Sequence, residues 1–132
     1  LAGIGRGQLK VLDERIAKKR YIYEFYKREL GKLDGIEMMP INEWNEPNCW
    51  LSCITLSGDV QPLNIIEALE RENIESRPIW KPMHMQPVFA EYDFIGEGIS
   101  EQIYANGVCL PSDTKMTDED LHRVCRIVEG LW

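Results

Sequence analysis

A chain of 132 residues fits one domain and is long enough to bury a sizeable core. Its 22 acidic and 15 basic side chains give a net charge of −7, which argues against a nucleic-acid surface because such surfaces need clustered Lys and Arg. No apolar run approaches the roughly 20 residues of a membrane span, and no basic-then-apolar signal peptide opens the chain, so we expect a cytoplasmic protein without a membrane partner.

One long amphipathic helix is the first predicted element, over about residues 8–30. Apolar side chains recur there every three or four positions, and Lys19 is the one exception to the stripe. At 1.5 Å per residue the helix would run roughly 35 Å, which is longer than a domain of this size needs for its own core. We therefore expect part of the stripe to pack against another domain or chain, and a homodimer is one such assembly.

Three glycines, at positions 3, 5 and 7, precede this helix. They invite comparison with a phosphate-binding loop, but no strand precedes them and the full dinucleotide-binding spacing is absent. Close packing of another backbone at the helix entrance is the favoured interpretation.

The cysteines are sparse and sit in apolar patterns, unlike those of a compact disulfide framework: Cys49, Cys53, Cys109 and Cys125. We expect reduced thiols. Cys49 and Cys53 have a C-x3-C spacing, but no matching pair or nearby His completes four ligands, so we expect no metal site.

A small sheet is predicted from short apolar runs. Residues 36–47 look irregular, whereas residues 48–56 form an apolar run that fits a central strand buried on both faces. Residues 74–80 are predicted to be extended, and residues 108–110 to form a further strand that stops at Pro111.

Three shorter helices are predicted around this sheet. Residues 60–72 follow a possible Asp59 cap, with Pro62 in the first turn. Ser100 is a possible cap for a helix that ends near residue 106. Residues 117–120 match the capping pattern of a final helix that reaches about residue 129. The expected buried side chains are Leu63, Ile66 and Leu69 in the first helix and Leu121, Val124, Cys125 and Val128 in the last, with His122 at the surface.

The predicted fold class follows from this order of elements. It is α+β, with a long N-terminal helix and a small sheet of about three strands covered by helices.

Residues 75–87 carry the strongest signal for a binding site. From position 77 to position 90 the chain has no acidic residue, and prolines at 78, 82 and 87 favour a stiff, non-helical path. Along this path lie a guanidinium, an indole, an ammonium and an imidazole, which together suit an anionic, partly flat ligand. These side chains are Arg77, Trp80, Lys81 and His84.

A structural role competes with binding at several of these positions. A solvated loop surface explains Arg77 and Lys81 equally well. For Trp80 a core position is favoured, and Met83 and Met85 are expected to fill gaps in the packing.

Three motifs resemble the DegT/DnrJ/EryC1/StrS family of aminotransferases, in the order in which that family has them. Residues 2–12 are similar to the family's "AAIG..QL..L" opening, residues 77–87 to its "RP.WKP.H.QP" segment, and residues 107–120 to its "G.CLPS" and "MTDED" ending. The pattern of the long helix continues through Lys19, Arg20 and Tyr26.

The resemblance implies that residues 1–132 form the C-terminal small domain of a larger enzyme. In this family pyridoxal 5'-phosphate is bound by a large upstream domain, which supplies the Schiff-base lysine. None of the seven lysines here stands in that motif, so we expect no catalytic or cofactor-binding residue in this stretch and no activity from it alone.

The complete enzyme is then expected to transfer an amino group, usually from glutamate, to a keto group of a nucleotide-linked sugar, as in polysaccharide biosynthesis. Arg77, Trp80, Lys81 and His84 are the candidate substrate contacts. Arg can form a bidentate fork to phosphate, Lys supplies a point charge, and His can donate to an oxygen.

Two alternatives from other classes remain open at this point. The chain could be a stand-alone dimerisation module, which the surplus helix length would suit. It could also bind nucleotide sugars without catalysing a reaction.

Overall fold

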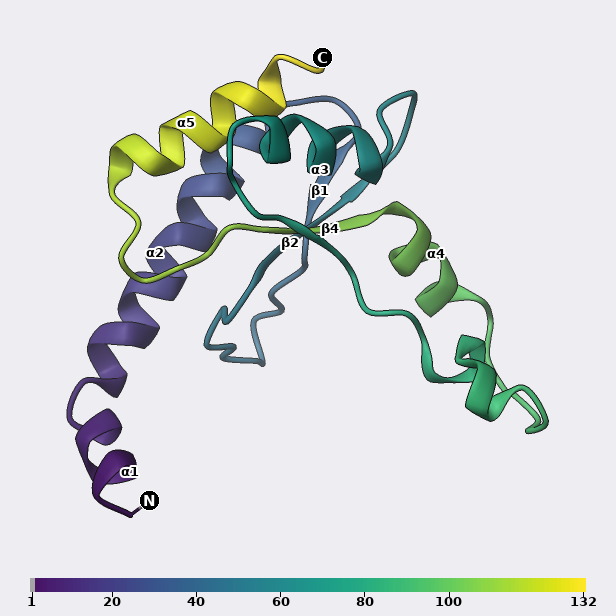
Figure 1. The fold of residues 1–132 in the computed structure, drawn as a ribbon, viewed down its shortest axis with the longest axis horizontal. Coiled ribbons are helices and arrows are strands. Elements are labelled where there is room, and N and C mark those ends of the chain that lie inside the picture. The colour runs from purple at the N-terminus through teal and green to yellow at the C-terminus, as the bar shows by residue number, and fades with distance from the viewer. Residues whose placement is uncertain (1) are drawn as a thin grey trace.

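The computed structural model describes residues 2–132. Strands β1 (Ile36–Met38), β2 (Ser52–Leu56), β3 (Arg77–Pro78) and β4 (Gly107–Leu110) form one sheet in the order β1-β2-β4-β3, and all neighbouring pairs are antiparallel. Helices α2 (Leu12–Leu30), α3 (Pro62–Arg71) and α5 (Asp118–Glu129) gather against this sheet (Figure 1). The α+β class is therefore confirmed, with four strands in the described residues where the sequence predicted about three.

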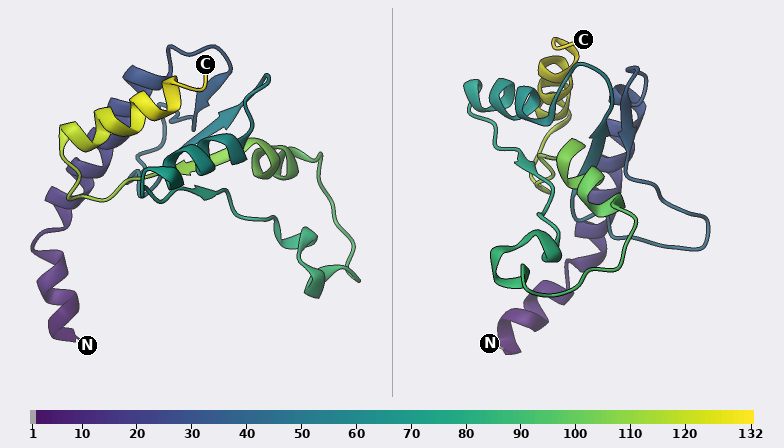
Figure 2. Two further views of the ribbon diagram at one scale, coloured as in Figure 1. Left: turned by 45° about the horizontal axis from the view of Figure 1, so that its top comes forward. Right: turned by 90° about the vertical axis from the view of Figure 1, so that its right-hand side faces the viewer.

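A single apolar core joins these elements. It contains side chains from α2, from the inner face of the sheet, and from α3 and α5. Two segments extend away from this body in Figure 2: α1 (Ala2–Leu9) beyond the start of α2, and the segment from η1 (Met83–Met85) and η2 (Pro87–Phe89) to α4 (Ile99–Asn106). Within residues 2–132, no helix combines the length and the apolar character that a membrane crossing requires.

The final helix follows its sequence signals closely. Thr117 caps α5 by accepting a hydrogen bond from the Asp120 N–H, and the Asp120 side chain accepts one from the Thr117 N–H in return. One face of α5 is buried through the predicted side chains Leu121, Val124, Cys125 and Val128. His122 is exposed, as predicted.

The predicted long N-terminal helix is two helices. At Lys10 and Val11 the backbone bonds to residues three positions earlier, Gly7 and Gln8, and this tighter turn separates α1 from α2. The three glycines lie inside α1 and not before a helix, and nothing in the described chain packs closely against them. The prediction of a close backbone approach there is therefore wrong within residues 2–132. No side chain of α1 is buried.

The sheet also differs from its prediction. Strand β1 lies in a stretch that was expected to be irregular, and it pairs with the far end of β2 through Ile36 and Leu56. Strand β2 is central, as predicted, but its burial alternates. Ser52, Ile54 and Leu56 are buried, while Cys53 is only half-buried, so only one face of the strand belongs to the core.

The caps and the buried face of the middle helices need correction. Gln61 caps α3 in place of Asp59, and Gly98, at a φ of 76°, precedes α4, so Ser100 lies inside that helix. In α3 the buried side chains are Ile65 and Leu69, with Ile66 partly buried, and Leu63 is exposed. The prediction is therefore confirmed for Leu69 and in part for Ile66, and it is wrong for Leu63, whose place in the core is taken by Ile65.

Candidate functional site

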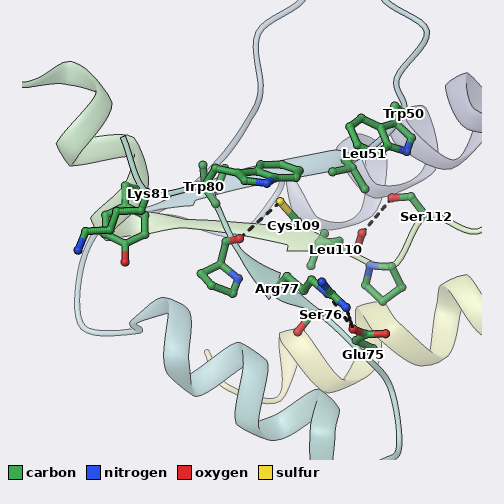
Figure 3. A pocket seen from close by; sticks show the side chains of 14 residues that line it. Trp50, Leu51, Glu75, Ser76, Arg77, Trp80, Lys81, Cys109, Leu110 and Ser112 are labelled. Carbon is green, nitrogen blue, oxygen red and sulfur yellow. Dashed lines mark hydrogen bonds and ion pairs between the residues drawn. The ribbon is translucent and has the colours of Figure 1, made fainter. Parts of the chain in front are cut away.

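An open cavity of about 670 Å³ lies at the junction of three segments. The segment from Glu75 to Lys81 forms one side, Trp50 and Leu51 before β2 form another, and the end of β4 with the residues after it forms the floor (Figure 3). Tyr104 of α4 completes the lining. Three of the four predicted site residues, Arg77, Trp80 and Lys81, thus line one cavity.

Two tryptophans form the apolar part of this cavity. The rings of Trp50 and Trp80 are 6.1 Å apart between centroids and inclined by 35°. The expectation that Trp80 lies in the core is wrong, because 64% of its surface is exposed. Trp50 was predicted inside a buried strand and is equally exposed. Two neighbouring indoles with open faces offer a surface on which a flat ring can stack.

The cationic part of the cavity is less positive than the local sequence indicated. The Arg77 guanidinium turns toward Glu75 and donates from Nε to Oε1 at 2.7 Å (Figure 3). Lys81 lies at the far end of the cavity and directs its amino group away from the indoles. An anionic ligand would therefore have to compete with Glu75 for Arg77, whereas Lys81 has no salt-bridge partner among residues 2–132.

His84 lies outside this cavity. It sits in η1 and, with Met83, Phe89 and Tyr92, lines a smaller cavity of about 210 Å³. The loop is thus not wholly non-helical as predicted, because η1 and η2 are single 3-10 turns. Met83 and Met85 are exposed, so the expectation that they fill gaps is wrong.

A tertiary contact fixes the ring of His84. Its Nε2 is 2.6 Å from Glu101 Oε1, and the ring stacks on Phe94 at 3.6 Å between centroids. Hydrogen bonds from its own backbone N–H and then from His84 and Ser100 lower the pKa of Glu101. Because an ionised carboxylate can only accept, the Nε2–H of His84 donates this hydrogen bond, which orients the imidazole. The sequence offered no signal for this pair, because Glu101 is 17 positions away.

Lys19 holds two segments of the cavity wall together, a role that the sequence pattern did not predict. Its amino group donates to the Trp50 carbonyl at 2.9 Å and to the Ser112 carbonyl, so it joins two walls of the cavity. Desolvation lowers the pKa of Lys19, and the nearby Asp113 partly opposes this. The sequence signal that could have indicated this role is the position of Lys19 as the one charged residue in an apolar stripe.

Lys19→Met is therefore expected to lower the free energy of unfolding by about 1–2 kcal/mol, because the carbonyls of Trp50 and Ser112 lose the charged donor that they share. Urea unfolding of the 132-residue chain measures this loss. Lys10→Met is the matched control, since Lys10 is exposed and its loss should leave the midpoint unchanged. A loss at position 19 no larger than at position 10 would contradict the bridging role.

The described residues do not fit a covalently held pyridoxal phosphate. A Schiff-base cofactor needs a desolvated lysine and a carboxylate that faces the pyridine nitrogen. Lys81, the lysine of the cavity, is exposed, and the carboxylate of Glu75 is engaged by Arg77. Within residues 2–132, no group of three or more His, Cys, Asp or Glu side chains could hold a metal ion.

Known proteins resemble this chain along its whole length. EpsN of Bacillus subtilis (strain 168), whose name proposes a pyridoxal phosphate-dependent aminotransferase, is 42% identical over 136 residues, which cover 100% of this chain and 35% of EpsN. The GDP-perosamine synthase of Vibrio cholerae is 31% identical over 139 residues, which cover 99% of this chain and 36% of that enzyme.

A solved structure shares the fold. The aminotransferase TlmJ from Streptoalloteichus hindustanus superposes with a TM-score of 0.85 at 21% identity, over 98% of this chain and 35% of that one. The chain spans about a third of the length of the curated relatives it matches. Residues 1–129 match the DegT/DnrJ/EryC1/StrS aminotransferase family, and the chain belongs to that family.

Proposed function

We propose that residues 1–132 form the small domain of a pyridoxal phosphate-dependent aminotransferase that transfers an amino group from glutamate to a nucleotide-linked keto sugar. The observation that carries this proposal is the family match over residues 1–129. The GDP-perosamine synthase among the relatives supports a nucleotide sugar as the substrate class. The homodimer expected from the sequence belongs to the same proposal.

The cofactor supplies the electron sink for amino transfer, and the protein supplies binding and orientation. Because the cavity residues do not fit that cofactor, we place the Schiff-base lysine outside residues 1–132 and expect these residues alone to be inactive. Their task is to hold the substrate. Arg77 and Lys81 would contact the diphosphate, while Trp50 and Trp80 would pack against a flat ring of the nucleotide or against the sugar.

His84 has a separate part in this proposal. Glu101 and Phe94 already hold its ring, so it loses little conformational freedom when it binds an oxygen of the ligand. Since it lies outside the main cavity, it would contact a part of the substrate that extends beyond the indoles.

Arg77→Ala and His84→Ala are each expected to weaken the binding of a GDP-linked sugar about tenfold or more in the complete polypeptide. The loss of a hydrogen bond to a charged group costs about 1.5–3 kcal/mol, and about 1.4 kcal/mol corresponds to a tenfold change in affinity. Isothermal titration calorimetry measures the affinity, and steady-state turnover of amino transfer provides the second readout.

Two matched variants control for general effects of losing a charge or a ring. Arg71 pairs with Glu67 on the exposed side of α3, and His122 is exposed on α5, so Arg71→Ala and His122→Ala should bind as the wild type does. If Arg77→Ala and His84→Ala also match the wild type in affinity and turnover, the loop is not part of the substrate site.

A further inference from the structure

Two of the four cysteines face each other across the sheet. Cys53 of β2 and Cys109 of β4 are direct partners in the register, and their sulfur atoms are 3.6 Å apart. Both are free thiols. They lie on the face of the sheet opposite to Ile54 and Val108, which belong to the core.

The backbone geometry of the pair suits a cross-link. The Cys53 carbonyl accepts from Met39 N–H on the β1 side at 2.9 Å, so the peptide groups of Cys53 point away from β4. In β4 the Gly107 carbonyl accepts from Ile79 N–H on the β3 side. Residues two positions apart in a strand direct their peptide groups to the same side, so the peptide groups of Cys109 also point toward β3 and away from β2.

Cys53 and Cys109 therefore form a non-hydrogen-bonded antiparallel pair. In such pairs the Cα atoms are about 4.5 Å apart and the side chains are at their closest. Disulfides span Cα separations of about 4.4–6.8 Å, so a bond between these two sulfurs requires little movement of the backbone.

We propose that Cys53 and Cys109 are a redox-active dithiol that forms a reversible disulfide by exchange with a low-molecular-weight disulfide. In the first step the Cys109 thiolate attacks one sulfur of that disulfide, which breaks its S–S bond and releases one small thiolate. In the second step the Cys53 thiolate attacks the Cys109 sulfur and expels the second small thiolate. The dithiol is oxidised, the small disulfide is reduced to two thiols, and the two cysteine protons pass to the released thiolates through solvent.

The surroundings of the four thiols favour Cys109 as the first nucleophile. A hydrogen bond from the Cys53 thiol lowers the pKa of Cys109, and the same contact raises the pKa of Cys53. Burial raises the pKa of Cys49 and raises that of Cys125 to about 12, which makes these two poor nucleophiles. Cys109 is 5% exposed and lines the cavity, so a small disulfide would approach its sulfur from there.

Oxidation would alter the floor of the cavity. In the reduced state the Cys109 thiol donates to the carbonyl of Pro78 at 4.0 Å, next to Arg77 in the sequence (Figure 3). A disulfide has no S–H, so this contact between β4 and β3 is lost. In its place a covalent bond joins β2 to β4 and closes a loop of 56 residues.

The test is to incubate the complete polypeptide with oxidised glutathione, block the remaining thiols with iodoacetamide and map the peptides by mass spectrometry. We expect a peptide pair linked through Cys53 and Cys109 that disappears with dithiothreitol. The melting temperature of the oxidised protein should rise by about 5–10 °C, because the cross-link restricts the unfolded chain.

Variants supply the control. Cys49→Ser and Cys125→Ser should keep the linkage and the rise in melting temperature, and Cys53→Ser or Cys109→Ser should lose both. Peptide mapping of the wild-type protein tests the proposal by itself, whether or not each variant folds. The proposal is overturned if both thiols of the wild type remain free, if they carry only glutathione, or if either one links to a different cysteine.

Discussion

Ile54→Ala is expected to lower the free energy of unfolding by about 3 kcal/mol, since large-to-small changes of this kind in a packed core cost about 2–5 kcal/mol. Ile54 lies in the middle of the central strand, between Met38 of β1 and Val108 of β4 in the register, and it is 1% exposed. Its side chain faces the cluster that α2, α3 and α5 share. Strands on both sides hold the backbone in place, so the cavity left by the lost atoms cannot collapse easily.

Urea unfolding of the 132-residue chain measures this loss. The urea concentration at the midpoint should fall, while the slope of the free energy of unfolding against urea concentration stays the same. Ile95→Ala is the matched control, because the same atoms are removed from a side chain that is 99% exposed, and it should cost less than about 0.5 kcal/mol. A cost below about 1 kcal/mol at position 54 would mean that the inner face of β2 is not tightly packed.

The sequence predicts those parts of the fold whose signals are local. Helix α5 is predicted almost to the residue because its capping box and its apolar stripe lie within the helix itself. The central place of β2 follows from its apolar run. Strand β1 has only three residues and β3 only two, which is too short for alternation to become visible. Their strand character comes from pairing with distant residues.

The candidate site shows the same limit. Proline and charge along residues 75–87 indicated a loop of candidate site residues, and Arg77, Trp80 and Lys81 of that loop line one cavity. Local sequence could not show that Trp50 would stand beside Trp80, or that Glu101 would pair with His84. Both contacts join residues far apart in the chain, and both depend on how the sheet places the segments before β2 and β4.

The raised pKa of the buried Tyr26 makes the free energy of unfolding depend on pH in the alkaline range. Tyr26 is fully buried in α2 and its hydroxyl donates to the Pro111 carbonyl at 2.8 Å. Burial raises the pKa of Tyr26 far above its ordinary value near 10, and the charges of Cys125 and Asp120 add to this. Above about pH 10 the unfolded chain therefore loses a proton that the folded chain keeps. Because the folded state then binds more protons, its stability falls as the pH rises.

For Tyr26 alone the loss approaches about 1.4 kcal/mol per pH unit and amounts to about 2 kcal/mol between pH 8 and pH 11.5. Tyr26→Phe removes the titrating group and also a buried hydrogen bond worth about 1 kcal/mol. The variant should be less stable than the wild type at pH 8 and more stable at pH 11.5, as measured by urea unfolding across that range. Tyr92→Phe, at a position that is 72% exposed, should follow the wild type throughout. If the free energies of unfolding of Tyr26→Phe and the wild type change in parallel with pH, the phenol ionises freely in the folded chain. If the two curves cross, the buried phenol that bonds to Pro111 causes the loss of stability in alkali.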